Sequence, residues 1–263
     1  MFPTFYIFGN QIGLFAIMAI CGGLTTGFWA CHTARKRGHN DNHMIILLLF
    51  AALGAFLGGQ LLFGLLNFPS LIILFRNIGD LSFSAFVDGL RVVFGGTIFF
   101  GGLMGSIFAG LITARILKLP ILSYTDMLAP AIPLFHAFGR IGCFLAGCCF
   151  GIEHRIGFTF TNSLLYAANN VRRLPIQLIE SFINLLLFIL LASLLKRDLL
   201  KGHLLLLYII FYSIMRFVLE FWRGDVARGF ILGLSTSQFI SLVLITLAGL
   251  IWIDLRKRAE KSR

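Results

Sequence analysis

Three polar side chains at helical spacing are the first group of residues that could do chemistry. His136, Arg140 and Cys143 are four and three residues apart, which places them on one face of a helix. The guanidinium group of Arg140 offers a fixed fork of donors that suits a phosphate oxyanion. The alternative is that Arg140 extends its charge to a polar surface or pairs with a carboxylate such as Glu180 or Glu220.

A second group combines a phenol, two guanidinium groups and a carboxylate at spacings of four, four and three: Tyr212, Arg216, Glu220 and Arg223. Two cations with one anion leave a net positive face, which suits an anionic lipid headgroup in a dry cavity. The alternative is an internal ion-pair ladder that only locks helices together. Gln177 and Glu180 share the face of another helical segment and could pair with either arginine.

Glycines accompany these polar residues. Gly139, Gly142 and Gly147 permit close approach of the backbone to a neighbouring helix or to a bulky ligand. A second glycine-rich segment, residues 95–105, contains Gly101 and Gly102. Tight helix packing is the main interpretation of this segment, and a broken helix that borders a lipid pocket is the alternative.

The cysteines predict a competing chemistry. Cys143, Cys148 and Cys149 lie at spacings of five and one, close to His136 and His154. The spacing C-x4-C-C is not an established zinc pattern, so we expect no metal. A disulfide or redox role for two of the three thiols is the alternative to ordinary buried thiols, which we favour. The remaining cysteines, Cys21 and Cys31, are expected to be structural.

The composition shows what kind of element must position these residues. The chain of 263 residues is 58% hydrophobic and 13% charged, with a mean hydropathy of +0.92. A soluble domain would be about 25% charged, so a soluble globule, a disordered chain and a disulfide scaffold are excluded. The net charge of +11 comes from Lys and Arg that punctuate apolar runs. It therefore indicates topology rather than nucleic-acid binding.

Seven apolar runs are long enough to cross a membrane: about 12–33, 44–66, 92–117, 121–145, 175–195, 203–222 and 235–253. Residues 68–90 are interrupted by Pro69, Arg76 and Asp80, which predicts an interfacial or re-entrant piece. Residues 1–11 contain no Lys or Arg, so we expect no signal peptide and expect the first run to stay in the mature protein. We predict an all-α integral membrane protein with seven transmembrane helices in a single domain over residues 1–263.

The charges of the connections predict the orientation. Thirteen of the 22 basic residues fall on one side of a seven-helix chain: Arg35, Lys36, Arg37, Arg115, Lys118, Lys196, Arg197, Lys201, Arg256, Lys257, Arg258, Lys261 and Arg263. By the positive-inside rule this side is cytoplasmic, so the N-terminus faces outward and the C-terminus inward. The longest outward connection, residues 151–174, contains the alternating segment 157–161, which predicts a short strand in a small extracytoplasmic cap.

Four segments in this order and spacing resemble the prolipoprotein diacylglyceryl transferase family. They are the run Phe100–Leu103, the glycine-arginine motif Gly139–Phe144 that closes at Gly151, the segment Pro175–Glu180, and the segment Arg216–Arg223. The family's enzymes are seven-helix proteins of the bacterial inner membrane. They move the diacylglyceryl group of phosphatidylglycerol to the thiol of the lipobox cysteine in a preprolipoprotein and release glycerol 1-phosphate.

The resemblance implies roles for the residues identified above. Arg140 would hold the headgroup phosphate, Arg216 would support the developing charge, and Glu220 with Arg223 would orient that helix. The implied partners are phosphatidylglycerol, the lipobox segment and membrane lipids, with no cofactor and no nucleic acid. The candidate substrate-binding residues are Gly101, Gly102, Gly139, Gly142, Cys143, Gln177, Glu180, Tyr212, Glu220 and Arg223.

Three positions depart from the family's pattern. Phe100 replaces the usual histidine before the double glycine, Cys143 replaces an asparagine, and Cys148 replaces a glutamate. Because Phe100 cannot accept a proton, His136 is the candidate general base in its place, so the catalytic residues are His136, Arg140 and Arg216. The alternatives are a lipid-binding protein that lost the chemistry and a membrane thiol-redox protein that uses the three cysteines.

Overall fold

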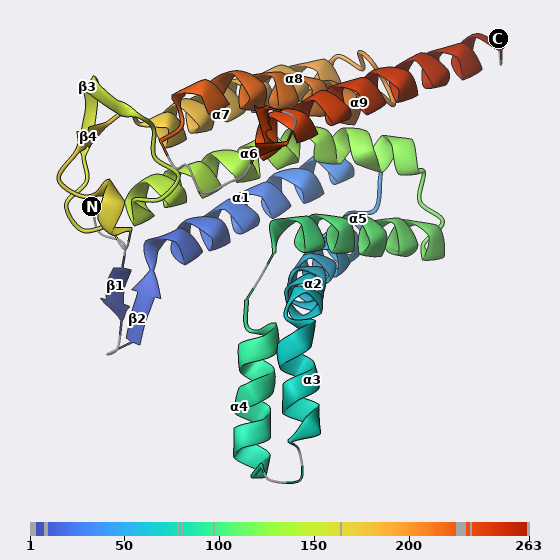
Figure 1. Cartoon of the computed structure of the whole chain (residues 1–263). Coiled ribbons are helices and arrows are strands. Elements are labelled where there is room, and N and C mark those ends of the chain that lie inside the picture. The colour runs from blue at the N-terminus through green and yellow to red at the C-terminus, as the bar shows by residue number, and fades with distance from the viewer. Residues whose placement is uncertain are drawn as a thin grey trace. The chain divides into compact units, whose positions relative to one another are not determined.

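The computed structural model describes residues 4–7, 10–77, 79, 81–96, 98–163, 165–224, 230–231 and 233–261, and these residues are mostly helical (Figure 1). The chain forms two compact units. One unit consists of residues 1–33 and 122–263, and the other of residues 34–121. The expectation of a single domain over residues 1–263 stays a prediction.

The larger unit is built from five helices: α1 (Leu14–Lys36), α6 (Ile121–Ala146), α7 (Ile176–Lys196), α8 (Leu204–Leu219) and α9 (Thr236–Lys261). The helix α6 is the most buried of the five. In its apolar stretch 44% of the residues are buried, against 17% in α1 and in α9. Its core cluster joins α6, α7 and α8 through Ala129, Leu191, Leu195, Leu204 and Tyr208. The outward flanks carry exposed apolar side chains such as Phe28 and Phe182, as expected of helices that face lipid.

A buried carboxylate connects α6 to the start of α8. Asp126 accepts hydrogen bonds from the backbone N–H groups of Gly202 and Leu204, the second at 3.1 Å. Helix N-termini leave such N–H groups without partners and favour negative charge. Asp126 therefore caps the N-terminus of α8, a role that its position in the sequence does not predict.

The smaller unit is built around the pair α2 (Asp41–Leu66) and α5 (Phe99–Ile116). A side chain on Gly54 would collide with the carbonyl oxygen of Gly105, and one on Gly101 would collide with that of Gly58. These glycines let the two backbones approach closely, as small residues do between membrane helices. The helices α3 (Phe68–Arg76) and α4 (Phe83–Phe94) form a hairpin in the segment expected to be interfacial or re-entrant.

Each of the seven predicted apolar runs contains a helix. The run 92–117 differs from the prediction at its start, because α4 ends at Phe94 and α5 begins at Phe99. Six helices are long and apolar enough to cross a membrane among the residues that the structure describes. The remaining one, α5, has 18 residues, or about 27 Å at 1.5 Å per residue. The structure thus confirms a mostly helical membrane protein with six candidate spans.

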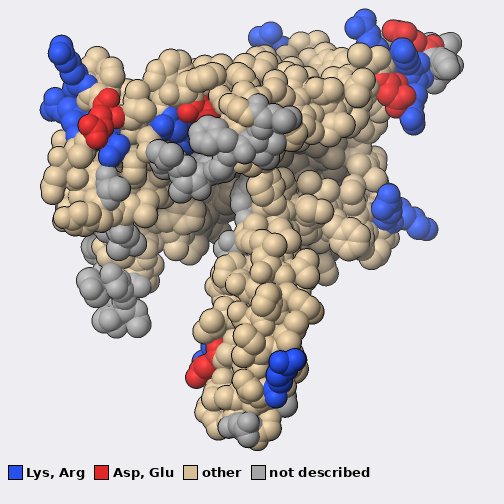
Figure 2. All heavy atoms as spheres, in the orientation of Figure 1, with Lys and Arg blue, Asp and Glu red and all other residues tan. Residues whose placement is uncertain are grey.

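A small β-structured segment follows α6. The strands β3 (Glu153–Thr159) and β4 (Arg172–Arg173) pair antiparallel, with the 3-10 turn η2 (Tyr166–Ala168) between them. The predicted strand at 157–161 is confirmed over residues 157–159. Phe150, Phe160 and Ala168 form the core of this segment. On the face shown in Figure 2, charges of the larger unit gather over this segment and at the C-terminal end of α9.

Short pieces complete the described chain. The strands β1 (Thr4–Ile7) and β2 (Asn10–Gly13) form a hairpin, and so do β5 (Phe230–Ile231) and β6 (Leu234–Ser235). The 3-10 turn η3 (Glu220–Trp222) directly continues α8.

Candidate functional site

A buried glutamate is the centre of the polar site. Glu180 on α7 is 1% exposed and forms ion pairs with three arginines. Arg140 on α6 approaches through Nε, Arg216 on α8 through Nη1 at 3.2 Å, and Arg223 after η3 through Nη1 at 3.6 Å. The two sequence groups and the segment 175–180 therefore meet at one carboxylate.

A second carboxylate completes the cluster. Glu220 forms an ion pair with Arg216, with 2.7 Å between Oε2 and Nη2. The same Nη2 donates a hydrogen bond to Ser237 Oγ on α9 at 2.9 Å. The three arginines and two glutamates carry a net charge of +1. Buried charges are tolerated when they are paired, so the excess positive charge makes the cluster receptive to an anion. We call Arg140, Glu180, Arg216, Glu220 and Arg223 the arginine cluster.

The three arginines differ in access. The side chain of Arg140 is 21% exposed, against 9% for Arg216 and 3% for Arg223. A Cβ on Gly139 would meet nothing within 4 Å, so there is space next to Arg140 along α6. Gly142 differs, because its Cβ would lie 3.1 Å from Phe15 of α1. Arg140 is thus the arginine that a ligand reaches first, with Gly139 leaving room and Gly142 packing a helix.

The backbone after α8 positions Arg223. The helix ends at Leu219, η3 follows, and Arg223 has an extended backbone with φ −81° and ψ 138°. The expected continuous helix face over residues 212–223 is therefore wrong for its last turn. The segment after η3 pairs with the loop after α6, through hydrogen bonds from Ile152 N to Trp222 O at 2.9 Å and from Gly224 N to Phe150 O at 3.0 Å. This pairing brings Arg223 beside the end of α6.

His136 is hydrogen-bonded within the same unit. Its Nδ1 lies 2.8 Å from the hydroxyl of Tyr208, and its ring centroid lies 5.1 Å from that of Tyr212. His136 therefore has one ring nitrogen fixed by a buried phenol, one helical turn before Arg140. The ring of Tyr212 packs against this imidazole and against the ring of Tyr208. The centroids of the two tyrosine rings are 5.6 Å apart.

Gln177 binds a backbone carbonyl in place of the expected arginine. It is fully buried and donates from Nε2 to the carbonyl oxygen of Cys148 at 2.7 Å. Its Oε1 is buried without a hydrogen-bond partner among the described residues. A buried amide oxygen of this kind is satisfied by a ligand or water that donates to it.

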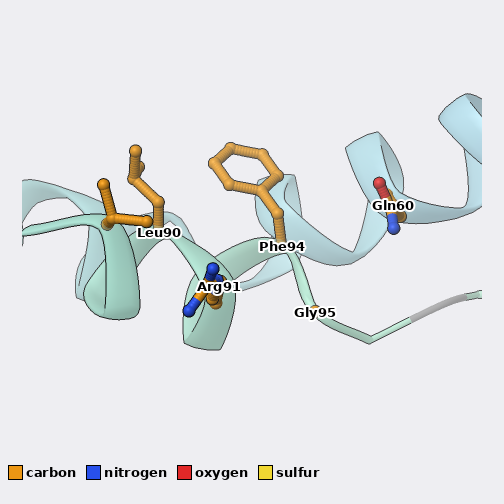
Figure 3. Close-up of a pocket in the computed structure, with 6 residues that line it drawn as sticks. Gln60, Leu90, Arg91, Phe94 and Gly95 are labelled. Carbon is orange, nitrogen blue, oxygen red and sulfur yellow. The ribbon is translucent and has the colours of Figure 1, made fainter. Parts of the chain in front are cut away.

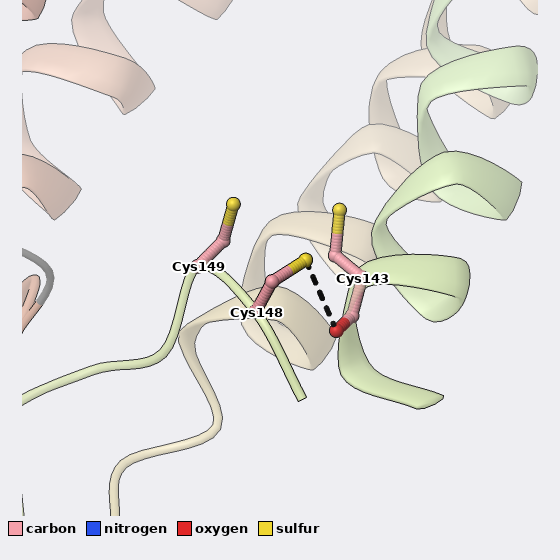
Figure 4. Close-up of side chains that lie close together, drawn as sticks. All are labelled: Cys143, Cys148 and Cys149. Atoms are coloured by element: carbon pink, nitrogen blue, oxygen red, sulfur yellow. Dashed lines mark hydrogen bonds between the residues drawn. The ribbon is translucent and has the colours of Figure 1, made fainter. Parts of the chain in front are cut away.

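The three cysteines converge at the C-terminus of α6 (Figure 4). The sulfur atoms of Cys143, Cys148 and Cys149 all lie within 4.8 Å of one another. The hydrogen bonds from Cys148 N to Cys143 O and from Gly147 N to Phe144 O, each 3.1 Å, form a Schellman motif. In this motif the residue after the glycine lies against the residue five positions earlier, which brings Cys148 to Cys143.

The same turn sets the environment of Cys149. Gly147 and Cys149 have positive φ angles of 74° and 57°, and Ser163 Oγ donates to the Gly147 carbonyl at 2.9 Å. Hydrogen bonds with Cys143 and Cys148, followed by the positive charge of Arg223, hold the pKa of the Cys149 thiol below its ordinary value. The thiol cluster therefore has a thiolate-forming member beside a cation.

Gly101 and Gly102 lie in the smaller unit. A Cβ on Gly101 would collide with Gly58, and a Cβ on Gly102 would lie 3.0 Å from the carbonyl oxygen of Ala55. The structure thus favours the helix-packing interpretation for both. Phe100, at the start of α5, is 45% exposed. The same unit has a shallow, mostly apolar groove between α2 and α4, lined by Gln60, Val87, Leu90, Arg91, Phe94 and Gly95 (Figure 3).

Some site contacts were not predicted. Ser237 binds Arg216, Ser181 Oγ donates to the Ala137 carbonyl at 3.0 Å, and Asn184 donates to the Glu180 carbonyl at 2.8 Å. Single hydroxyl and amide residues in apolar helices are common, so their spacing alone carries no signal for these contacts.

Comparisons with known proteins show which proteins the chain is similar to. The family profile described as prolipoprotein diacylglyceryl transferase matches residues 3–254. The chain is 33% identical over 243 residues to the phosphatidylglycerol--prolipoprotein diacylglyceryl transferase of Clostridium tetani, which covers 92% of both chains. It is 31% identical over 260 residues to transferase 2 of Clostridium perfringens, covering 96% of this chain and 91% of that protein. The Campylobacter jejuni protein of the same name is 28% identical over 258 residues, covering 96% and 93%.

Proposed function

Because the chain belongs to the prolipoprotein diacylglyceryl transferase family, we propose that it moves the diacylglyceryl group of phosphatidylglycerol to the lipobox cysteine thiol of a prolipoprotein. The observation that carries this proposal is the arginine cluster. It has a net charge of +1 and one partly exposed arginine, Arg140. A phosphodiester headgroup supplies the negative charge that such a cluster lacks.

The reaction is a displacement at carbon. The acceptor thiolate attacks the terminal glyceryl carbon that bears the phosphate, a C–S bond forms, and the C–O bond breaks. The phosphate leaves with the bonding electrons as glycerol 1-phosphate. Arg140 binds the phosphate oxygens, and Glu180 holds this guanidinium group in place, so the donor is oriented before charge develops on the leaving group.

Arg216 and Arg223 support the developing charge from behind Arg140. Both are nearly buried and share Glu180 with Arg140, so negative charge that develops on a phosphate at Arg140 also interacts with the other two arginines. Glu220 and Ser237 fix the orientation of Arg216. Gly139 leaves room for the lipid beside Arg140, whereas Gly142 keeps α6 against α1.

His136 is the proposed general base. In this role Nδ1–H donates to the Tyr208 hydroxyl oxygen, and Nε2 accepts the proton of the acceptor thiol. This role compensates for Phe100, which has no group that can take a proton. Phe100 also favours the second candidate function, a protein that binds anionic phospholipid at the arginine cluster without transferring it. A thiol-redox protein that uses Cys143, Cys148 and Cys149 is the third candidate.

The proposed topology has seven transmembrane helices, with α5 as the shortest. The N-terminus and the cap formed by β3 and β4 lie outside a bacterial inner membrane, and the C-terminal end of α9 lies in the cytoplasm. The charges that support this orientation follow α1, α5, α7 and α9 along the chain.

A transfer assay tests the function. Purified protein is incubated with phosphatidylglycerol and a lipobox peptide, and the peptide mass is followed by mass spectrometry. We expect the mass to increase by one diacylglyceryl group, with no increase for a peptide in which serine replaces the cysteine. Arg140→Gln should lower kcat/KM by at least about 100-fold, whereas Arg155→Gln on the exposed strand β3 should not.

The outcomes separate the candidates. Lipid binding that depends on Arg140, without transfer, would replace the enzyme by the lipid-binding protein. Reversible oxidation of the cysteines, with neither lipid binding nor transfer, would favour the redox protein.

A further inference from the structure

The convergent thiols of Cys143, Cys148 and Cys149 have no role in the reaction described above. Their sulfur atoms lie within 4.8 Å of one another. Thiolates bound to zinc at 2.3 Å in a tetrahedral arrangement are about 3.8 Å apart, so binding needs an inward shift of about 1 Å or less. A disulfide would use only two of the three sulfurs. The geometry therefore suits a shared ligand better than a bond between two members.

The turn that follows α6 builds this arrangement. The Schellman motif at Gly147 places Cys148 against Cys143, and the positive φ angle of Cys149 turns its side chain to the same side. In Figure 4 the sulfur atoms of Cys143 and Cys149 point the same way, and the sulfur of Cys148 lies between these two side chains and donates to the Cys143 carbonyl oxygen at 3.6 Å. Ser163 and Gln177 anchor the turn through the carbonyl groups of Gly147 and Cys148. The spacing C-x4-C-C is not an established zinc pattern. The turn nevertheless brings the three thiols of this spacing close together.

The surrounding charge favours a divalent thiophilic ion. Three thiolates and Zn²⁺ carry a net charge of −1, which nearby cations stabilise. Arg140 interacts electrostatically with Cys143 and Cys149, and Arg223 with Cys149. The thiols therefore lie beside two guanidinium groups, whose positive charge favours the thiolate form. Soft thiolate ligands select zinc over the hard cations magnesium and calcium.

We propose that Cys143, Cys148 and Cys149 bind one zinc ion as thiolates and leave its fourth coordination position open. Three protein ligands with one exchangeable position are typical of zinc sites that act on a substrate. Gln177 offers a buried acceptor next to this turn, because its Oε1 has no hydrogen-bond partner among the described residues and its Nε2 binds Cys148. Water in the open position can donate to such an acceptor.

On the proposed function, the fourth ligand is the acceptor thiol. A thiol that coordinates zinc loses its proton, which passes to the base of the reaction, and the zinc-bound sulfur then supplies the electron pair that forms the C–S bond. The C–O bond breaks, and its electron pair leaves with the phosphate. No electron is exchanged with the metal. This role rests on the proposed transfer, whereas the metal site itself does not.

Metal content tests the site. Full-length protein purified in detergent is dialysed against a low zinc concentration, and bound zinc is measured by inductively coupled plasma mass spectrometry. We expect one zinc per chain, and a loss of affinity of more than about 100-fold in Cys148→Ser. Cys21→Ser on α1 is the matched control and should keep the metal. Zinc no higher in the wild type than in Cys148→Ser, or a disulfide between two of the three thiols, would overturn the proposal.

Cobalt substitution tests the open position without any transfer. The protein is loaded with Co²⁺, and the thiolate-to-cobalt absorption is recorded before and after addition of the lipobox peptide, with no phospholipid present. A fourth thiolate should raise this absorption by about one third, and a peptide with serine in place of cysteine should not. An unchanged spectrum would remove the acceptor-thiol role and leave the metal site. Since no phospholipid is used, failure of the transfer assay does not affect either result.

Discussion

Glu180→Gln is the substitution that most strongly tests the arginine cluster. The change keeps the size of the side chain and removes the charge that Arg140, Arg216 and Arg223 share. At an effective dielectric constant near 20, a pair at 3.2 Å or 3.6 Å gives about 5 kcal/mol of attraction. Removing Glu180 leaves buried guanidinium groups without this partner, and the loss of one buried partner costs about 3–5 kcal/mol.

Unfolding in mixed micelles with increasing dodecyl sulfate, followed by circular dichroism, measures this loss. We expect Glu180→Gln to lower the free energy of unfolding by about 3–5 kcal/mol. Asp88→Asn is the control, because its ion pair with Arg91 is exposed and should contribute about 0–1 kcal/mol. Phosphatidylglycerol should recover part of the lost stability by supplying negative charge to the folded state. A loss in Glu180→Gln no larger than that in Asp88→Asn would refute the description of Glu180 as the centre of the cluster.

The remaining predictions concern the base, the lipid and the glycines. His136→Gln should lower kcat by about 100-fold or more, leave KM for phosphatidylglycerol nearly unchanged and remove the acid limb of the kcat profile against pH; an intact acid limb would exclude His136 as the base. Gly139→Val should keep the melting temperature but raise KM for phosphatidylglycerol, because its Cβ has open space; an unchanged KM would mean that the lipid lies elsewhere. Gly101→Leu should abolish folding through its contact with Gly58, whereas Gly110→Leu should be tolerated, since a Cβ there meets nothing within 4 Å; equal expression and melting of the two variants would contradict this packing. Gly147→Ala should lower the free energy of unfolding by about 1–2 kcal/mol because of its φ of 74°, and a neutral result in the same unfolding assay would argue against the turn.

The sequence predicted the helices well, because an apolar run of about 20 residues matches the length of a helix that crosses the hydrocarbon core and far exceeds that of a buried strand. Its periodicity also placed His136, Arg140 and Cys143 on one helix, α6. The pair of Arg140 with Glu180 was the alternative to phosphate binding, and the structure contains this pair. Periodicity cannot tell which helices are neighbours, since the lipid-facing and protein-facing sides of a membrane helix are both apolar. The convergence of three arginines on Glu180 therefore required the packing of α6, α7 and α8.

Local turns account for the other differences. The end of α8 at Leu219 and the 3-10 turn that follows shift Arg223 off the expected helix face. At the end of α6, Gly147 closes a Schellman motif that brings Cys148 to Cys143. A single glycine has many meanings in a glycine-rich membrane chain, so this turn was visible only in the structure.

The most direct test of the central claim measures both products of the transfer in one reaction. Phosphatidylglycerol with a labelled headgroup is supplied with the lipobox peptide, and the modified peptide and the free glycerol phosphate are counted together. The arginine cluster as the phosphate site of a transferase predicts one glycerol phosphate released for each peptide that gains a diacylglyceryl group. With Arg140→Gln, both products should form at least about 100-fold more slowly. Release of glycerol phosphate without peptide modification, or equal transfer by Arg140→Gln and the wild type, would contradict the claim.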